Sequence, residues 1–399
     1  MTTQAMSKPM PEPRPLPPDE PARQRIRTSL DETLFVEAGA GSGKTTALVE
    51  RIVSSVKAGV AITEIAAITF TEKAASELRH RIREELGRAA EVNDRARQDF
   101  DAVIVEGKND MTGDQVVEAA TKHRAGAIMF TNTLLLNAAT IARLPDTVQA
   151  AATSSVGFDH IDVAAAKARG IAVTNTPGVL TECTADHAFM MLLAAARRAF
   201  EYDRIMRQGW RYRIGQGDLL GVRVTGKTLG ILGMGRIGQA MAQRARGFDM
   251  KIVYHARNRL PPEQENGATW FADFLEMLPH CEFLSMHAPA NAATDKIVNA
   301  KALSLLPDGA IFVNVSRGGL VDEDALLAAL KSGKLFAAGL DVFREEPDFD
   351  TRFANLDNVF LSPHVGSASR ETRNAMGFRA LDNIAAVLAG KNPIDPLWT

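Results

Sequence analysis

Short hydrophobic runs and longer amphipathic or alanine-rich stretches alternate along the chain from about residue 98 onward. The runs are rich in residues that favour strands, and the stretches between them are long enough for crossover helices. This alternation predicts parallel strands connected by helices. The first series has predicted strands at 101–106, 125–130, 148–155 and 171–176, with helices at 114–123 and 162–170.

A second series of the same kind starts at residue 228, after a long and mostly apolar helix predicted over 182–206. A last helix at 369–389 is expected to pack back against the first series. The predicted strands of the second series are 228–232, 251–255, 283–287, 310–315, 336–342 and 358–362. The pattern therefore predicts an α/β protein with two parallel sheets.

The first 97 residues have a different character. Residues 1–21 are rich in proline and polar groups and bury too little apolar surface to order themselves, so we expect a disordered tail. Predicted strands at 33–37 and 65–71 flank a helix at 45–57, and a charged helical stretch covers 72–97. The domains predicted from these patterns are 1–21, 22–97, 98–196 completed by 369–399, and 197–368.

A glycine-rich turn, GMGRIG, follows the first strand of the second series and opens a helix. Gly233 permits the tight turn, Gly235 lets the backbone approach a pyrophosphate, and Gly238 lets the helix pack closely on the strand. Arg236 and Ile237 begin the helix, whose amino-terminal amides and dipole favour phosphate. These residues predict a dinucleotide site in a Rossmann domain.

The next strand ends in HARNRL, and this end selects the cofactor. An acidic residue about 20 positions after the glycine turn would bind the ribose 2′-hydroxyl of NAD, and none occurs there. Arg257 can instead meet the 2′-phosphate of NADP, with Arg259 as a second candidate, because guanidinium suits phosphate. We expect NADP(H) to be preferred and NAD(H) to be the alternative; otherwise the arginines simply face solvent.

Arg317, Glu346 and His364 each follow a predicted strand of the second series, on the side where ligands bind in such sheets. A guanidinium can hold and polarise a keto acid. An imidazole can donate a proton to the carbonyl oxygen as hydride reaches the carbon, and a neighbouring carboxylate stabilises the protonated imidazole. Together the three residues predict catalysis of 2-keto acid reduction.

Seven stretches carry a family resemblance: SVGFDHID, TNTPGVLTECTADHA, LGILGMGRIGQA, MHAPANAATDKIVN, VNVSRGGLVDEDAL, AAGLDVFREEP and LSPHVGSA. From about residue 98 to 399 the chain resembles the D-isomer-specific 2-hydroxyacid dehydrogenases, above all the NADP-dependent glyoxylate/hydroxypyruvate reductases. The resemblance implies a Rossmann domain with a flavodoxin-like substrate domain, and a homodimer. It also implies reduction of glyoxylate or hydroxypyruvate to the D-2-hydroxy acid.

The same resemblance implies that Arg317 binds substrate and takes part in catalysis, that His364 is the acid and base, and that Glu346 supports it. Further implied residues are Val156 and Gly157, whose amides would hold the substrate carboxylate, and Asp341 and Gly366, which would contact the cofactor.

Some positions depart from the family pattern, and some residues inside the matching stretches are expected to have only structural roles. Arg213 stands where a second aromatic residue often accompanies Trp210, which leaves the preferred substrate size open. Cys281 stands where aspartate is common. Structural roles, not catalysis, are expected for three histidines inside the matching stretches: His160, His187 and His287.

A second phosphate-binding motif, AGAGSGKTT, occupies residues 38–46. Gly43 would free the backbone to wrap phosphates, Lys44 would reach the β- and γ-phosphates, and Thr45 would hold Mg²⁺. With its surroundings, residues 18–88, it resembles the start of UvrD/RecB-type helicases and exonucleases. The acidic magnesium motif, the arginine finger and the later helicase motifs are missing, so we expect an idle P-loop, with residual ATP binding as the alternative.

The related dehydrogenases begin with a central strand of the substrate domain that has no counterpart in family sequence here. We hypothesise that the run IAAITFT at 65–71 takes this place, with 72–97 as its crossover helix. If nothing fills the place, the substrate domain has an open gap in its sheet.

The amino-acid composition argues against nucleic-acid-binding and membrane-bound classes of protein. A net charge of −2, with 24% charged and 46% hydrophobic residues, gives no electrostatic case for nucleic acid or a membrane surface. No apolar run approaches the ~18 residues of a membrane span, no metal site is predicted, and two cysteines suggest a reducing compartment, so we expect a cytoplasmic protein. The rival interpretations are a nonfunctional chimera and an ATP-binding helicase or exonuclease fragment fused to a dehydrogenase.

Overall fold

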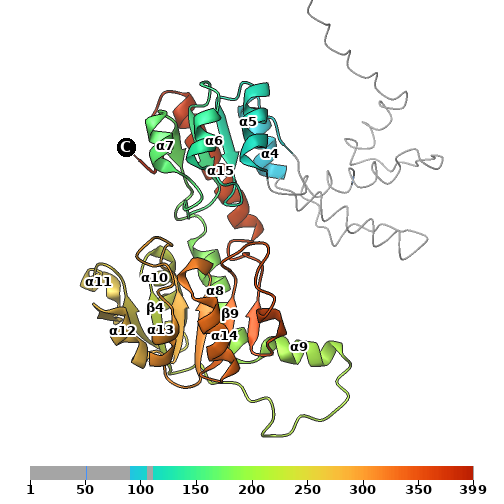
Figure 1. Cartoon of the computed structure of the whole chain (residues 1–399), viewed down its shortest axis with the longest axis vertical. Coiled ribbons are helices and arrows are strands. Elements are labelled where there is room, and N and C mark those ends of the chain that lie inside the picture. The colour runs from blue at the N-terminus through green and yellow to red at the C-terminus, as the bar shows by residue number, and fades with distance from the viewer. Residues whose placement is uncertain (1–50, 52–89, 106–110, 399) are drawn as a thin grey trace, which may run out of the picture. The chain divides into compact units, whose positions relative to one another are not determined.

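The computed structural model describes residue 51, residues 90–105 and residues 111–398. The expected tail, the P-loop with Gly43, Lys44 and Thr45, the strands at 33–37 and 65–71 and most of the stretch 72–97 lie outside the described residues. From Arg95 onward the chain forms one compact unit with two parallel sheets (Figure 1). No helix in the described part of the chain is long and apolar enough to cross a membrane.

The larger sheet has seven parallel strands in the order β10-β9-β8-β7-β4-β5-β6. Their bounds are β4 Thr228–Leu232, β5 Lys251–His255, β6 Thr269–Phe271, β7 Phe283–Met286, β8 Ala310–Asn314, β9 Leu335–Leu340 and β10 Val359–Leu361. The order reverses between β4 and β7, and ligands bind at the carboxyl ends of strands at such a point. The predicted α/β fold with a Rossmann domain is confirmed; the short edge strand β6 was not predicted.

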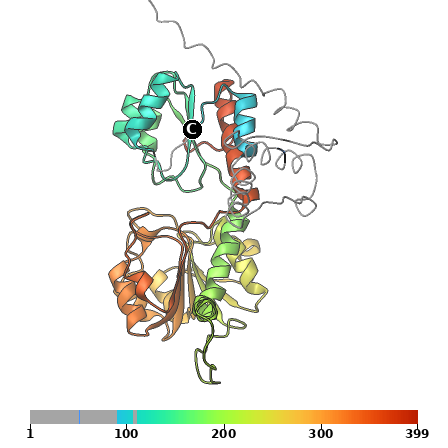
Figure 2. The ribbon, with the colours of Figure 1, turned by 90° about the vertical axis from the view of Figure 1, so that its right-hand side faces the viewer.

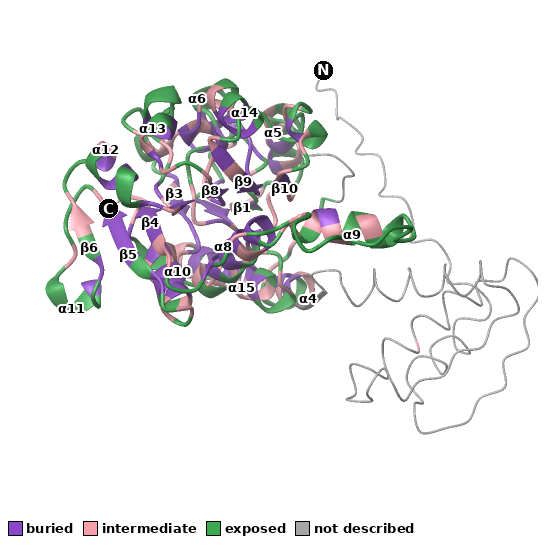
Figure 3. Cartoon of the chain, turned by 90° about the horizontal axis from the view of Figure 1, so that it is seen from below, coloured by how far each residue is buried: buried purple, intermediate pink, exposed green. Residues whose placement is uncertain are grey.

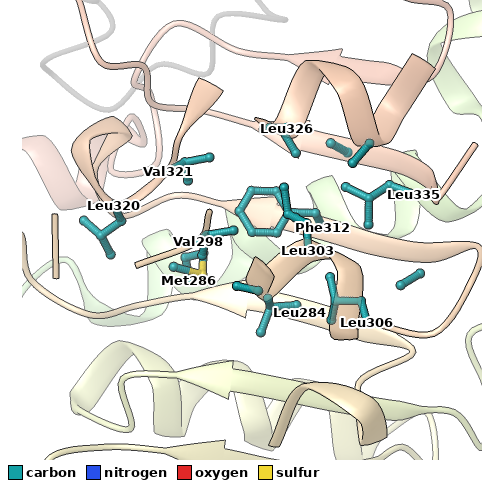
Figure 4. Packing of buried hydrophobic residues seen from close by; sticks show 14 of the residues in the cluster. Leu284, Met286, Val298, Leu303, Leu306, Phe312, Leu320, Val321, Leu326 and Leu335 are labelled. Atoms are coloured by element: carbon teal, nitrogen blue, oxygen red, sulfur yellow. The ribbon is translucent and has the colours of Figure 1, made fainter. Parts of the chain in front are cut away.

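Helices cover both faces of this sheet. On one face lie α8 (Thr181–Ala196) and α10 (Arg236–Arg246), and on the other lie α13 (Ala300–Leu305) and α14 (Glu323–Lys331). Strand side chains alternate between the faces, so that Ile311 packs with α8 while Phe312 packs with α13 and α14. Figure 4 shows the cluster around Phe312, and Figure 3 shows the buried strands between helices with exposed outer surfaces.

Shorter elements connect the strands: α11 Pro262–Glu265, α12 Phe274–Met277 and 3₁₀ turns at Leu278–His280, Gly318–Leu320 and Phe353–Asn355. The sheet, these connections and its covering helices are called the large lobe below.

The prediction of one continuous helix over 182–206 is wrong, because α8 ends at Ala196 and a second helix, α9, spans Ala199–Arg207. Arg198 between them has the left-handed φ of 51°. The Ala196 carbonyl accepts a hydrogen bond from the Val222 amide at 2.8 Å, a residue distant in sequence. A helical pattern in the local sequence contains no sign of this distant partner.

The smaller sheet has three parallel strands in the order β1-β2-β3. Their bounds are β1 Ala127–Phe130, β2 Ala150–Thr153 and β3 Ala172–Thr174, and the helices are α5 Gly113–Lys122, α6 Ala138–Arg143, α7 Val163–Ala168 and α15 Arg370–Leu388. As expected of the last helix, α15 packs back on β1 and β2. Helix α4 (Ala90–Asp99) lies beside α15, where Arg95 Nη2 is 2.6 Å from Asp382 (Figure 2). These elements form the small lobe.

The strand predicted at 101–106 is wrong for residues 101–105, which have no regular secondary structure. Val103 and Val105 are each 51% exposed. A strand needs a neighbour for its backbone hydrogen bonds, and among the described strands β1 has only β2 beside it. The hypothesis that 65–71 supplies a central strand concerns residues outside the described part of the chain.

Asn383 of α15 ties the carboxyl-terminal segment to the small lobe. Its Oδ1 accepts from the amides of Ile394 and Asp395 at 2.8 and 2.9 Å, and its Nδ2 donates to the Asp395 carboxylate at 3.0 Å. The residue is fully buried. The next residues reach β3, because the Leu397 amide donates to the Val173 carbonyl at 2.9 Å.

We expect Asn383→Ala to lower the free energy of unfolding by about 1–3 kcal/mol, because it leaves buried polar groups without partners. Urea denaturation followed by circular dichroism measures this loss, and Asn392→Ala at an exposed position is the matched control. Equal stability of the two variants would contradict this role of Asn383.

Candidate active site

The glycine turn between β4 and α10 has the geometry of a phosphate-binding turn. Gly233 has the left-handed φ of 96°, and a Cβ there would lie 2.5 Å from the Ala288 amide nitrogen. A Cβ on Gly238 would collide with the Gly233 carbonyl, so this position requires close packing of helix on strand. A Cβ on Gly235 would meet nothing within 4 Å. The space beside Gly235 is therefore open to a ligand.

The first turn of α10 fits the pyrophosphate of a dinucleotide. Gly235 is the N-cap residue, and no side chain caps the helix amides. Arg236 is exposed and Ile237 is half-buried at the start of the helix. Uncapped amides at a helix amino terminus attract anions, and this one lies at the point where the strand order reverses.

The two arginines after β5 differ sharply. Arg259 donates from Nε and Nη2 to the two carboxylate oxygens of Glu265 at 2.8 and 2.9 Å. Hydrogen bonds from Arg259 and then from the Tyr254 hydroxyl lower the pKa of Glu265 to about 2. Arg257 is exposed, and no residue in the described part of the chain pairs with it. Of the two candidates, Arg257 is the one left available to a phosphate.

His364 and Glu346 form a pair at the ends of β10 and β9. His364 Nδ1 lies 2.7 Å from Glu346 Oε2, and Glu346 Oε1 accepts from the Phe343 amide at 2.8 Å. Burial opposes ionisation of Glu346, but the hydrogen bonds from His364 and Phe343 lower its pKa. No residue in the described ranges pairs with His364 Nε2, so this ring nitrogen is available for proton transfer.

Arg317, after β8, reaches the small lobe. Its Nε and Nη2 each lie 3.0 Å from Asp159 Oδ1, and its Nη1 donates to the Ser316 carbonyl at 2.8 Å. A Cβ on Gly157 would collide with Arg317 Nη2, so only glycine leaves room for the guanidinium. Although burial disfavours the charged form, Arg317 lowers the pKa of Asp159, which keeps that carboxylate ionised.

The loop after β2 offers free amides. The Val156 carbonyl accepts from Asn175 Nδ2 at 2.8 Å, and the Gly157 carbonyl accepts from the Ser155 hydroxyl at 2.6 Å. In the part of the chain that the structure describes, neither the Val156 nor the Gly157 amide donates a hydrogen bond. Fixed carbonyls with unpaired amides suit the binding of a carboxylate beside Arg317.

Asp341 and Gly366, the two residues expected to contact the cofactor, are joined by a hydrogen bond. The Gly366 amide donates to Asp341 Oδ2 at 2.9 Å, and Asp341 is 1% exposed. Both lie at the carboxyl ends of the same two strands, β9 and β10, as Glu346 and His364.

The three motif histidines are all engaged in hydrogen bonds. His160 Nε2 lies 3.0 Å from the Thr153 hydroxyl and His287 Nε2 lies 2.8 Å from the Ser285 hydroxyl. Burial lowers the pKa of each of these two rings to about 4. His187 contacts Asp341, as described below.

Three further positions were flagged in the sequence as departures from the family pattern or neighbours of one. Cys281 is fully buried, and burial raises the pKa of its thiol to about 12. Trp210 is 55% exposed after α9, and Arg213 is exposed in the same segment.

Sequence reasoning missed the partners that hold the predicted residues in place. Asp159 holds Arg317, and Ser155 and Asn175 fix the loop of Val156 and Gly157. Ser155 is the first residue of the SVG turn and Asp159 follows the turn by two positions, which was a local signal. No sequence pattern indicates that residues 159 and 317 lie close together.

Comparison with known proteins agrees with this geometry. The family described as "D-isomer specific 2-hydroxyacid dehydrogenase, NAD binding domain" matches residues 189–366. A glyoxylate reductase of Thermococcus litoralis is 47% identical over 243 residues, covering 60% of this chain and 73% of the relative. A glycerate dehydrogenase of Hyphomicrobium methylovorum is 39% identical over 302 residues, covering 74% of this chain and 92% of the relative.

Solved structures show the same similarity. A putative D-isomer specific 2-hydroxyacid dehydrogenase from Polaromonas matches with a TM-score of 0.73 and 40% identity, over 77% of this chain and 96% of that one. An NADPH-dependent glyoxylate/hydroxypyruvate reductase from Sinorhizobium meliloti, in complex with NADP and malonate, matches with a TM-score of 0.69 and 35% identity, over 77% and 92% of the two chains.

A second family, the UvrD/REP helicase N-terminal domain, matches residues 19–143. The match confirms the helicase-like resemblance and extends past the predicted limit of residue 88. Its last part includes α5, β1 and α6, which pack in the small lobe.

The glycine turn, the paired His364 and Glu346, and the relative that is 47% identical over 73% of its own length agree on one family. The chain belongs to the D-isomer specific 2-hydroxyacid dehydrogenases and is an NAD(P)-dependent oxidoreductase of 2-hydroxy acids.

Proposed function

We propose that this protein reduces glyoxylate or hydroxypyruvate to the D-2-hydroxy acid with NADPH. The observation that carries the proposal is the 2.7 Å pair of His364 and Glu346 at the ends of β10 and β9. Arg317 follows the neighbouring strand β8 and lies beside Gly157 of the small lobe. Relatives named glyoxylate reductase and a similar structure of an NADPH-dependent glyoxylate/hydroxypyruvate reductase support this substrate class.

His364 supplies the proton in this proposal. Glu346 accepts a hydrogen bond from the Nδ1–H group of His364, so a protonated ring carries its second proton on Nε2. The anionic Glu346 stabilises that cationic ring and orients it. When bound, the nicotinamide supplies a hydride for the substrate carbonyl carbon, and His364 Nε2 donates the proton to the carbonyl oxygen.

Arg317 and the loop of Val156 and Gly157 bind the substrate in this proposal. The two amides donate hydrogen bonds to the substrate carboxylate, and the guanidinium next to Gly157 adds a charge-assisted hydrogen bond to the carboxylate or the carbonyl oxygen. Because Asp159 and the Ser316 carbonyl hold the guanidinium, its position is set before substrate arrives.

Arg257 selects NADPH in this proposal. It is exposed at the end of β5, beyond the glycine turn, and no acidic residue occupies the sequence HARNRL. Arg259 contributes less, because both of its bonded nitrogens face Glu265.

Assembly as a homodimer and a cytoplasmic location are part of the proposal. The homodimer rests on the family resemblance, and the location rests on the composition of the sequence. The proposed function includes no ATPase activity of the P-loop, because the sequence lacks the acidic residue that would help to hold magnesium. The rival interpretation as a nonfunctional chimera predicts no turnover.

Replacing His364 removes the proposed acid. We expect His364→Asn to lower kcat with glyoxylate by about 10² to 10⁴, the range for loss of a general acid. Steady-state oxidation of NADPH measures the change, and His123→Asn, an exposed histidine of the small lobe, is the control. If His364→Asn kept wild-type kcat, the ring would not be the acid.

Replacing Glu346 removes the partner of that ring. Glu346→Gln is expected to lower kcat by about 10 to 10², as for the loss of one charge-assisted hydrogen bond. The alkaline limb of the pH profile should move to lower pH, since the cationic ring loses its counter-charge. An unchanged pH profile would argue against the pair.

Glu346 also makes stability depend on pH. Because its pKa is lowered in the folded protein, its ionised form stabilises the fold above the ordinary glutamate pKa, and this contribution disappears as pH falls through the lowered pKa. Thermal unfolding of wild type and Glu346→Gln should therefore differ near neutral pH and converge in acid. A difference that grew in acid would have the wrong sign.

Replacing Arg257 tests the cofactor choice. We expect Arg257→Ala to raise KM for NADPH by about 10 to 10², the effect of losing hydrogen bonds to a charged phosphate, and to leave KM for NADH unchanged. Arg223→Ala, at an exposed arginine before β4, removes the same charge as a control. Equal effects on the two cofactors would assign Arg257 no part in selectivity.

A further inference from the structure

The loop that carries His364 is bonded to a single buried carboxylate. Asp341 Oδ1 accepts from the Ser362 hydroxyl at 2.5 Å and from the Val365 amide at 2.9 Å, and Oδ2 accepts from the Gly366 amide at 2.9 Å. The Asp341 carbonyl accepts from the His364 amide at 2.8 Å. Asp341 thus holds His364 itself and the residues on both sides of it.

His187, on α8, completes the arrangement from the covering helix. Its Nε2 lies 3.2 Å from Asp341 Oδ1 and 3.0 Å from the Ser362 hydroxyl, and its side chain is 13% exposed. Burial of Asp341 opposes its ionisation, but hydrogen bonds from His187, Ser362 and Val365 lower its pKa. A carboxylate that accepts hydrogen bonds from these donors is held in one orientation.

The backbone of His364 requires such support. Its φ is 52°, in the left-handed region that residues other than glycine rarely adopt. A conformation of this kind persists where the surrounding structure over-determines it. The hydrogen bonds to Asp341 are the local interactions that do so, and they fix the point from which the imidazole reaches Glu346.

The carboxylate of Asp341 is enclosed by the protein. Its side chain is 1% exposed, and the hydrogen bonds to its two oxygens come from the loop Ser362–Gly366. Burial of this degree leaves the carboxylate little surface for the cofactor contact that the family resemblance implies for Asp341.

We propose that Asp341 and His187 are positioning residues that hold the loop Ser362–Gly366, and with it the imidazole of His364, in the geometry for proton transfer. The inference rests on the proposed function of His364. In this proposal Asp341 binds the protein's own loop. His187 lies on α8, which covers the sheet face opposite α14, and it acts on the reaction through that loop.

One substitution separates this role from a cofactor contact. Asp341→Asn keeps the size of the side chain but replaces one acceptor oxygen with a donor that opposes the loop amides. We expect kcat to fall by about 10 to 10², from the loss of charge-assisted hydrogen bonds, with unchanged NADPH affinity by fluorescence titration. Weakened NADPH binding with normal kcat at saturation would overturn the proposal.

His187 offers a matched pair of variants. His187→Gln can still donate an N–H toward Asp341 and should retain most of the wild-type kcat. His187→Leu fills the space without a donor and should lose kcat in parallel with Asp341→Asn. Equal kcat for the Gln and Leu variants would overturn the part assigned to His187.

A readout without substrate keeps the test independent of the proposed reaction. The NMR signals of the His364 ring, assigned by their absence in His364→Asn, should be single and sharp in the wild type and in His187→Gln. They should broaden or split in Asp341→Asn and His187→Leu. If the wild type were inactive but showed these differences in the His364 signals, only the proposed reaction would be wrong. If the His364 signals were the same in the wild type and all variants, the positioning role would be wrong.

Discussion

The groups that the large lobe contributes to the candidate site depend on the parallel arrangement of its seven strands. In a parallel sheet all carboxyl ends lie at one edge, and the reversal of order between β4 and β7 opens that edge to a ligand. The glycine turn follows β4, Arg317 follows β8, and Glu346 and His364 follow β9 and β10. Residues more than a hundred positions apart in sequence, such as Gly233 and His364, therefore lie at the same edge of the sheet without any local signal that joins them.

The apolar clusters on both faces hold this sheet in place. Ile311 and Val313 pack under α8, while Phe312, between them in β8, packs under α13 and α14. Near-complete burial of such side chains stabilises by about 1.5–3 kcal/mol each. The rigid sheet then needs only short loops to carry chemistry, and the buried Asp341 carboxylate ties one of those loops back to the sheet end.

The sequence allowed prediction of the features that depend on local pattern. The strands β4, β5 and β8, the glycine turn and the position of each candidate catalytic residue after a strand were all visible in short windows. The end of α8 was not, because it depends on a hydrogen bond from Val222, and neither was the failure of 101–105 to form a strand, because a strand needs a neighbour.

The partners within the site were also beyond the sequence. Asp159 and Arg317 belong to different lobes, so only the folded chain shows that they pair. Arg257 and Arg259 look alike in the sequence, yet Glu265 engages only Arg259. The sequence predicts a structural role for His187, and its contact with Asp341 links it to the loop of His364.

The proposed function requires that the chain, with its amino-terminal segment attached, is a working NADPH-dependent reductase of a small 2-keto acid. The most direct measurement is the rate of NADPH and of NADH oxidation by the purified full-length protein with glyoxylate and with hydroxypyruvate. We expect turnover with at least one of the two acids and a higher kcat/KM with NADPH than with NADH. Soluble protein that binds NADPH but turns over neither acid would contradict it and favour a nonfunctional chimera.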